Sequence, residues 1–89
     1  MNTKDAERTL KALANKRRLE IVKFLRRTKE AVVGDIADQI KLSFKATSKH
    51  LGVLLSADIV EKEQRSLQAW YKLSPSQNTL SKHISNSLE

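Results

Sequence analysis

The chain has 89 residues, the length of one small domain, and it contains no cysteine. So short a chain leaves little volume for a buried catalytic cleft, and without thiols it has no disulfides, thiolate metal sites or thiol catalysis. Its 17 basic and 10 acidic residues give a net charge of +7. A domain this basic usually meets a polyanion, although charge alone leaves a nucleic acid, a membrane surface or an acidic protein open.

Two helices are expected in the first third of the chain. Apolar residues recurring at i, i+4 and i+7 predict the first helix over residues 4–13. Asn15 is a typical N-cap, so a second helix is predicted to begin directly after it and to end near residue 27. Basic side chains, among them Arg17 and Arg18, are interleaved with the apolar face of this second helix.

The middle of the chain has the pattern of two short helices joined by a turn. Residues 31–33 are too few for a helix and are predicted as a stub of strand. A third helix is expected over residues 34–40, with Lys41 in the turn that follows. Ser43 is a typical N-cap for a fourth helix, which is expected to end near residue 57.

After the fourth helix the apolar pattern changes from helical to strand-like. Residues 59–63 and 69–73 are predicted to pair as a hairpin, linked by residues 65–68. The order is then two helices, a short strand, two helices, two strands and a final helix. This mainly α order with a small β-hairpin is that of a single winged helix-turn-helix domain, with the helix-turn-helix at about 34–57 and the wing at about 59–73.

The last helix is predicted to begin at Ser74, with Pro75 in its first position and Gln77 closing a capping box. Its apolar residues form one stripe that a domain this small does not easily cover. Together with apolar residues of the first helix, this stripe predicts a homodimer interface; the alternative is that both helices only cover their own core. The residues expected at the interface are Leu10, Leu13, Leu80, Ile84 and Leu88.

The fourth helix has two distinct faces on a helical wheel. The apolar face consists of Thr47, Leu51, Leu54 and Leu55. The opposite face is a compact polar strip that consists of Lys45, Ser48, Lys49 and Gly52. A helix with cations and a hydroxyl on its outer face suits the major groove of DNA, where such side chains reach base edges or phosphates. The alternative is an ordinary amphipathic helix with a solvated polar face.

Three segments together resemble one known family. They are LKALANKRRLEI at residues 10–21, LSFKATSKHLGVL at 42–54 and WYKL at 70–73. These segments are similar to the first helices, the recognition segment and the wing of ArsR-type winged-helix transcriptional regulators. The resemblance implies a cytoplasmic, homodimeric repressor of the ArsR type that binds double-stranded DNA. A two-fold dimer of this kind would read a near-palindromic operator.

The resemblance also implies which residues contact DNA. By position these are Ser43 as the cap, then Phe44, Lys45, Ser48, Lys49 and His50. Arg17, Arg18 and Lys41 are expected to contact phosphates, and Arg65 is the one cation in the turn of the wing. Phe44 stands where a polar residue is usual, and it either contacts a thymine methyl group or packs back on the third helix.

The chain departs from the family at the metal-sensing positions. Where the metal-sensing branch has two cysteines at the start of the third helix, this chain has Val32 and Gly34. The last helix offers only His83 and Glu89 toward a second family site, so no metal or cofactor is expected. No catalytic constellation is visible, which argues against an enzyme. The remaining alternative is a winged helix that contacts another protein or an RNA.

Overall fold

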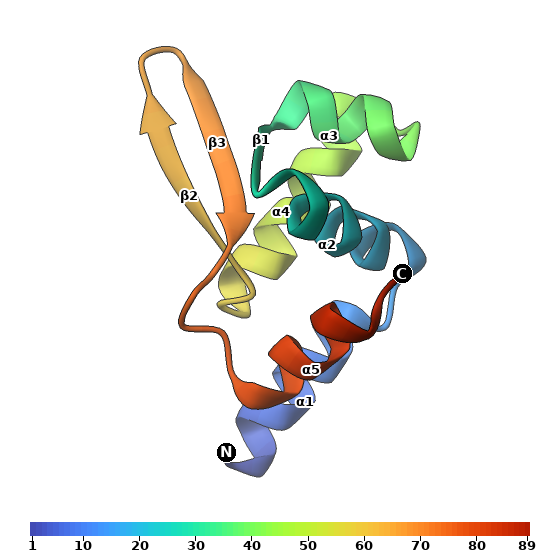
Figure 1. The fold of residues 1–89 in the computed structure, drawn as a ribbon, viewed down its shortest axis with the longest axis vertical. Coiled ribbons are helices and arrows are strands. Elements are labelled where there is room, and N and C mark those ends of the chain that lie inside the picture. Colours follow the sequence, from blue (N-terminus) through green and yellow to red (C-terminus); the bar gives the residue numbers. More distant parts are fainter.

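Eight helices and strands follow one another in the predicted order (Figure 1). The computed structural model describes residues 1–89, as follows: α1 (Thr3–Leu13), α2 (Lys16–Thr28), β1 (Glu30–Val32), α3 (Val33–Ile40), α4 (Phe44–Ser56), β2 (Val60–Arg65), β3 (Gln68–Leu73) and α5 (Thr79–Ser87). This is the winged helix-turn-helix that the sequence predicts, in which α3 and α4 form the helix-turn-helix and β2 and β3 the wing. None of the helices is both long and apolar enough to cross a membrane.

Two of the predicted helix caps are confirmed. The Asn15 side chain accepts a hydrogen bond from the backbone N–H of Arg18 at 3.1 Å, and it thereby caps α2. Ser43 Oγ accepts from the backbone N–H of Ala46 at 3.1 Å, which caps α4. Each cap satisfies a backbone donor that has no partner within the helix.

The predicted start of the last helix at Ser74 is wrong. Ser74 is buried, its backbone N–H donates to the carbonyl of Ile59 at 2.9 Å, and its hydroxyl accepts from the backbone N–H of Ser76 at 3.2 Å. These bonds hold Ser74 at the end of the sheet in a tight turn, where it cannot cap a helix. Asn78 caps α5 instead, because its side chain accepts from the backbone N–H of Ser81 at 2.9 Å.

The sheet connects the wing to the helix-turn-helix. Its strand order is β1-β3-β2, with antiparallel pairing throughout. Tyr71 of β3 lies opposite Ala31 on one side and Lys62 on the other. Tyr71 is buried while Trp70 is partly exposed, as the alternation of a strand requires. Because α3 begins directly after β1, the sheet holds the wing in a fixed position beside α3.

The core lies where α2, α3, α4 and the base of the sheet meet. Its largest fully buried aliphatic side chains are Ile21, Leu25, Ile36, Leu51, Leu54 and Ile59. Thr47 is also fully buried, as the wheel predicts, whereas Leu55 is 37% exposed. Leu55 therefore lies at the edge of the apolar face and is not buried in the core, unlike Thr47, Leu51 and Leu54.

α5 packs beside α1 at one end of the molecule (Figure 1). The Asn78 side chain donates to the Thr9 hydroxyl at 2.8 Å, and Ile84 and Leu88 pack partly buried against the core. Leu13 is 3% exposed and belongs to the core of its own chain, so its predicted place in a dimer interface is wrong. Leu10 is half exposed. The other three residues predicted at the interface remain partly accessible; they are Leu80, Ile84 and Leu88.

Candidate nucleic-acid interface

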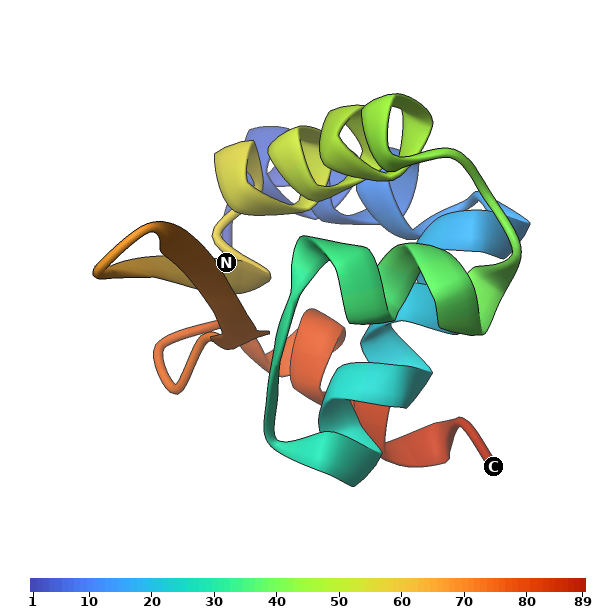
Figure 2. The same cartoon turned by 90° about the horizontal axis from the view of Figure 1, so that it is seen from above.

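The polar strip of α4 lies on the surface of the molecule. α4 runs along one face, and the hairpin projects at its side (Figure 2). Lys45, Lys49 and Gly52 are exposed and Ser48 is half-buried, while the opposite side of α4 is buried in the core. The cap at its first turn and the buried apolar face fix the position of α4. The strip is therefore a preorganised surface with two cations and a hydroxyl.

Phe44 is at the start of α4 and is 63% exposed. It borders a hollow of about 480 Å³ between the start of α3 and the turn of the wing, to which Val33 and Leu67 also contribute. Leu67 at the wing tip is 96% exposed. Two large apolar side chains thus face solvent on either side of this hollow, and Phe44 does not bury its ring on α3.

Two of the predicted phosphate ligands already have partners within the protein. The Arg17 guanidinium donates to the carbonyl of Ile40 at the end of α3 and lies 3.5 Å from Glu20. Arg18 Nε donates to the carbonyl of Ala12 at 2.6 Å, at the end of α1. Both cations therefore satisfy carbonyl groups at helix C-termini, where positive charge is favourable. Their first role in the structure is to join α2 to α1 and α3.

His50 connects α4 to the same arginine. Its Nδ1 lies 3.1 Å from Nη1 of Arg18, so the neutral ring accepts a hydrogen bond from the guanidinium. Burial lowers the pKa of His50, and the positive charges of Arg18 and Arg17 lower it further. His50, which the resemblance places among the DNA-contacting residues, thus also forms a contact between α2 and α4.

This contact predicts that acidification destabilises the fold. Unfolded His50 titrates near pH 6.5, and folded His50 titrates lower, so the unfolded state binds the proton first as the pH falls. Stability should be highest above about pH 6.5 and should decrease below it. Thermal unfolding at pH 7.5 and 5.5 should show a smaller loss in His50→Asn, which removes the titrating ring. The matched variant His83→Asn replaces an exposed histidine of α5 and should lose as much stability as wild type. An undiminished loss in His50→Asn would contradict this origin.

The wing carries little unpaired charge. Two nitrogens of Arg65 donate to the Glu30 carboxylate at 3.0 and 2.8 Å, and its guanidinium lies 5.0 Å from the centre of the Trp70 ring. The hydrogen bond from Arg65 lowers the pKa of Glu30, and the same pair raises the pKa of Arg65. Lys72 lies 3.2 Å from Glu61 on the neighbouring strand. Contact of Arg65 with DNA would require it to leave the carboxylate that ties the wing to β1.

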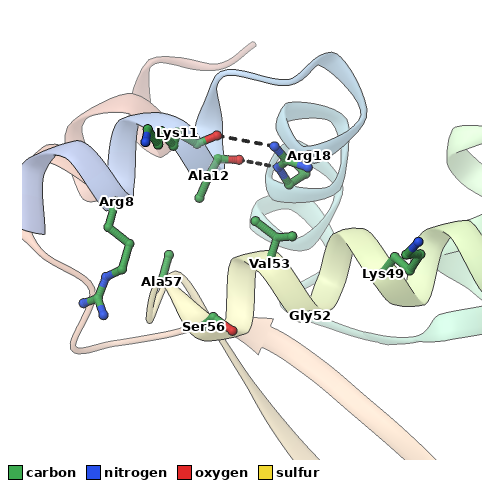
Figure 3. Close-up of a pocket in the computed structure, with 9 residues that line it drawn as sticks. All are labelled: Arg8, Lys11, Ala12, Arg18, Lys49, Gly52, Val53, Ser56 and Ala57. Atoms are coloured by element: carbon green, nitrogen blue, oxygen red, sulfur yellow. Dashed lines mark hydrogen bonds between the residues drawn. The ribbon is translucent and has the colours of Figure 1, made fainter.

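One surface feature was not predicted from the sequence. A groove of about 560 Å³, here called the α1–α4 groove, lies between α1 and the second half of α4 (Figure 3). It lies among Arg8, Lys11, Lys49, Gly52, Val53 and Ser56, with small side chains and Arg18 completing its lining. No sequence pattern predicts this groove, because α1 and α4 are far apart along the chain. The only sequence feature related to the groove is the pair of cations Arg8 and Lys11 in α1, and their spacing does not indicate which element they face.

Comparison with known proteins identifies the family. The family model described as "Bacterial regulatory protein, arsR family" matches residues 15–62. This range covers α2 through the first residues of β2, including the whole helix-turn-helix. Among curated proteins, the arsenical resistance operon repressor of Bacillus subtilis (strain 168) is 33% identical over 67 residues. The match covers 75% of this chain and 64% of that repressor, so the chain spans less than two thirds of the relative.

Solved structures show the same architecture. Reduced HlyU from Vibrio cholerae has a TM-score of 0.81 and 33% sequence identity, and the match covers 96% of this chain and 85% of that one. The transcriptional repressor PagR of Bacillus anthracis has a TM-score of 0.81 and 26% identity over 97% of this chain and 94% of its own. A homodimeric winged helix-turn-helix DNA-binding domain from Mycobacterium bovis has a TM-score of 0.81 and 26% sequence identity, and the match covers 93% of this chain and 74% of that one. The family and the fold are those of transcription regulators and not of enzymes. The chain belongs to the arsR family of bacterial regulatory proteins.

Proposed function

We propose that the protein is a cytoplasmic, homodimeric repressor that binds double-stranded DNA at a near-palindromic operator. The observation that carries the proposal is the exposed strip of α4, because Lys45, Ser48 and Lys49 are presented from a helix whose other face is fixed in the core. A helix of this kind fits the major groove, and these side chains suit base edges and phosphates.

The residues around the strip have distinct parts in this proposal. Ser43 caps the first turn of α4, and Phe44, whose ring is exposed, contacts a thymine methyl group. Lys41, exposed in the turn before α4, supplies a phosphate contact. Arg17 and Arg18 act mainly by orienting the helices, since their guanidinium groups already bond to carbonyl oxygens.

Dimerisation would involve α1 and α5. The similar domain from Mycobacterium bovis is a homodimer, and here Leu10, Leu80 and Ile84 remain accessible on these two helices. A two-fold axis at this end of the molecule would present two copies of α4 to successive major grooves, about 34 Å apart. Repression then follows from occupation of the operator, which excludes the polymerase.

Selection of bound duplexes from a random DNA pool tests the proposal. The selection is carried out at about 0.15 M salt, which suppresses much of the sequence-independent attraction to phosphates. The expected product is an inverted repeat with half-sites about one helical turn apart. Binding without a consensus would overturn sequence-specific regulation. An absence of binding to any duplex would favour a winged helix that contacts a protein or an RNA.

A further inference from the structure

The α1–α4 groove is continuous with the polar strip of α4. Lys49 and Gly52 belong to both, since they form the end of the strip and one wall of the groove (Figure 3). The other wall is α1, which contributes Arg8 and Lys11. A partner that lies along the outer face of α4 would therefore extend over this groove toward α1.

The groove is positively charged, and no acidic side chain lines it. Lys49 forms no ion pair. Arg8 and Lys11 of α1 each form ion pairs, but these are long and exposed to solvent. Arg8 lies 3.4 Å from Asp58, and Lys11 lies 3.9 Å from Glu7. Exposed pairs of this kind contribute little stability, so both cations can exchange their carboxylates for phosphate oxygens.

The second observation is the presence of a glycine at position 52, which no contact within the protein explains. Gly52 lies in the interior of α4 and is exposed, and it has no positive φ angle. A Cβ atom built on Gly52 would meet nothing within 4 Å, so no neighbouring group of the chain requires the absence of a side chain. Glycine within a helix weakens the helix relative to alanine. A residue that costs stability and leaves open space indicates close approach from outside.

We propose that one strand of the operator backbone lies in the α1–α4 groove and passes directly over Gly52. Arg8, Lys11 and Lys49 contact its phosphate oxygens. The inference rests on the proposed function and extends the DNA-binding surface from the strip of α4 to Arg8 and Lys11 of α1. Because the groove is on the side of α1, a dimer formed through α1 and α5 would place these phosphates toward the centre of the operator, between the two half-sites.

Gly52→Ala gives the sharpest test, because stability and affinity are expected to change in opposite directions. The melting temperature should rise by about 3–8 °C, since alanine favours the helix. Operator affinity should fall by about tenfold or more, since the methyl group keeps the backbone away from α4. Gly34→Ala is the matched control, because a Cβ there also meets nothing within 4 Å and Gly34 is outside the groove. It should leave affinity unchanged.

Arg8→Ala combined with Lys11→Ala tests the electrostatic part. A dimer would lose four phosphate contacts, so the slope of log affinity against log salt should become less steep by about 3–4. Hydroxyl-radical footprinting should show that protection of the deoxyriboses in the central backbone is lost. The control, Lys23→Ala combined with Lys82→Ala, removes the same charge from residues that do not line the groove. Its footprint should remain that of wild type.

The outcomes separate this inference from the proposed function. If wild type binds an inverted repeat while Gly52→Ala and the Arg8/Lys11 variant bind it equally well, the groove does not hold DNA and is open to another anion. If the Gly34 control loses as much affinity as Gly52→Ala, the effect is not specific to the groove and the inference fails. If wild type selects no sequence, the proposed function fails and the inference fails with it.

Discussion

Replacing Ser48 and Lys49 together by alanine is expected to lower operator affinity about a thousandfold at 0.15 M salt, which abolishes specific binding. Contacts of this type contribute about 1–3 kcal/mol each, and a dimer loses two at each half-site. Both residues are on the outer side of α4, and alanine favours a helix at least as well. Equilibrium binding to the selected operator and to an unrelated duplex measures the effect.

The charge change alone does not account for this expectation. Lys23→Ala removes one cation from the exposed surface of α2 and should change operator affinity by no more than about threefold. Circular dichroism of the Ser48/Lys49 variant should show an unchanged helix content. If this folded variant still prefers the operator over the unrelated duplex, the strip of α4 does not read the sequence.

The element order could be predicted because its signals are local. Asn15 and Ser43 each begin a helix through a bond to a backbone N–H three residues ahead, so neighbouring residues suffice to recognise the cap. The strip of α4 could be predicted for a similar reason. Its residues recur at helical spacing, and the helix buries one side only.

Ser74 shows where local signals mislead. The pattern Ser-Pro-Ser-Gln is typical of a helix start, yet Ser74 bonds to the carbonyl of Ile59 in the turn that begins the wing. Ser74 and Ile59 become neighbours only after β2 and β3 pair. Because Ser74 is held by this tertiary contact, the last helix begins after Asn78 and not at Ser74.

The hydrogen-bond partners of Arg17, Arg18 and Arg65 could not be predicted, because these partners are distant in the sequence. Arg17 bonds to a carbonyl 23 residues away, Arg18 to a histidine 32 residues away, and Arg65 to a carboxylate 35 residues away. Charge patterning treats all three as available cations, whereas the folded chain uses them to join helices and to tie the wing to β1. The availability of a cation for phosphate is thus a property of the fold and not of composition.

α4 has to present one face and bury the other, and these tasks depend on different residues. Leu51 is fully buried one turn away from Leu55, which is 37% exposed on the same helix. α4 packs against α2, α3 and β2, so its buried face meets every layer of the core. Rigid presentation of the strip therefore depends on side chains that DNA never touches.

Leu51→Ala is expected to reduce the free energy of unfolding by about 2–5 kcal/mol, because the truncation leaves a cavity in the core. A domain of this size has about 5–13 kcal/mol in total, so the variant should lose a large part of its stability. Leu55→Ala makes the same chemical change at the exposed edge and should lose less than about 1 kcal/mol. Urea unfolding followed by circular dichroism compares the two. Equal losses would mean that Leu51 does not fix α4 in the core, and the rigid strip on which specific binding depends would lose its physical basis.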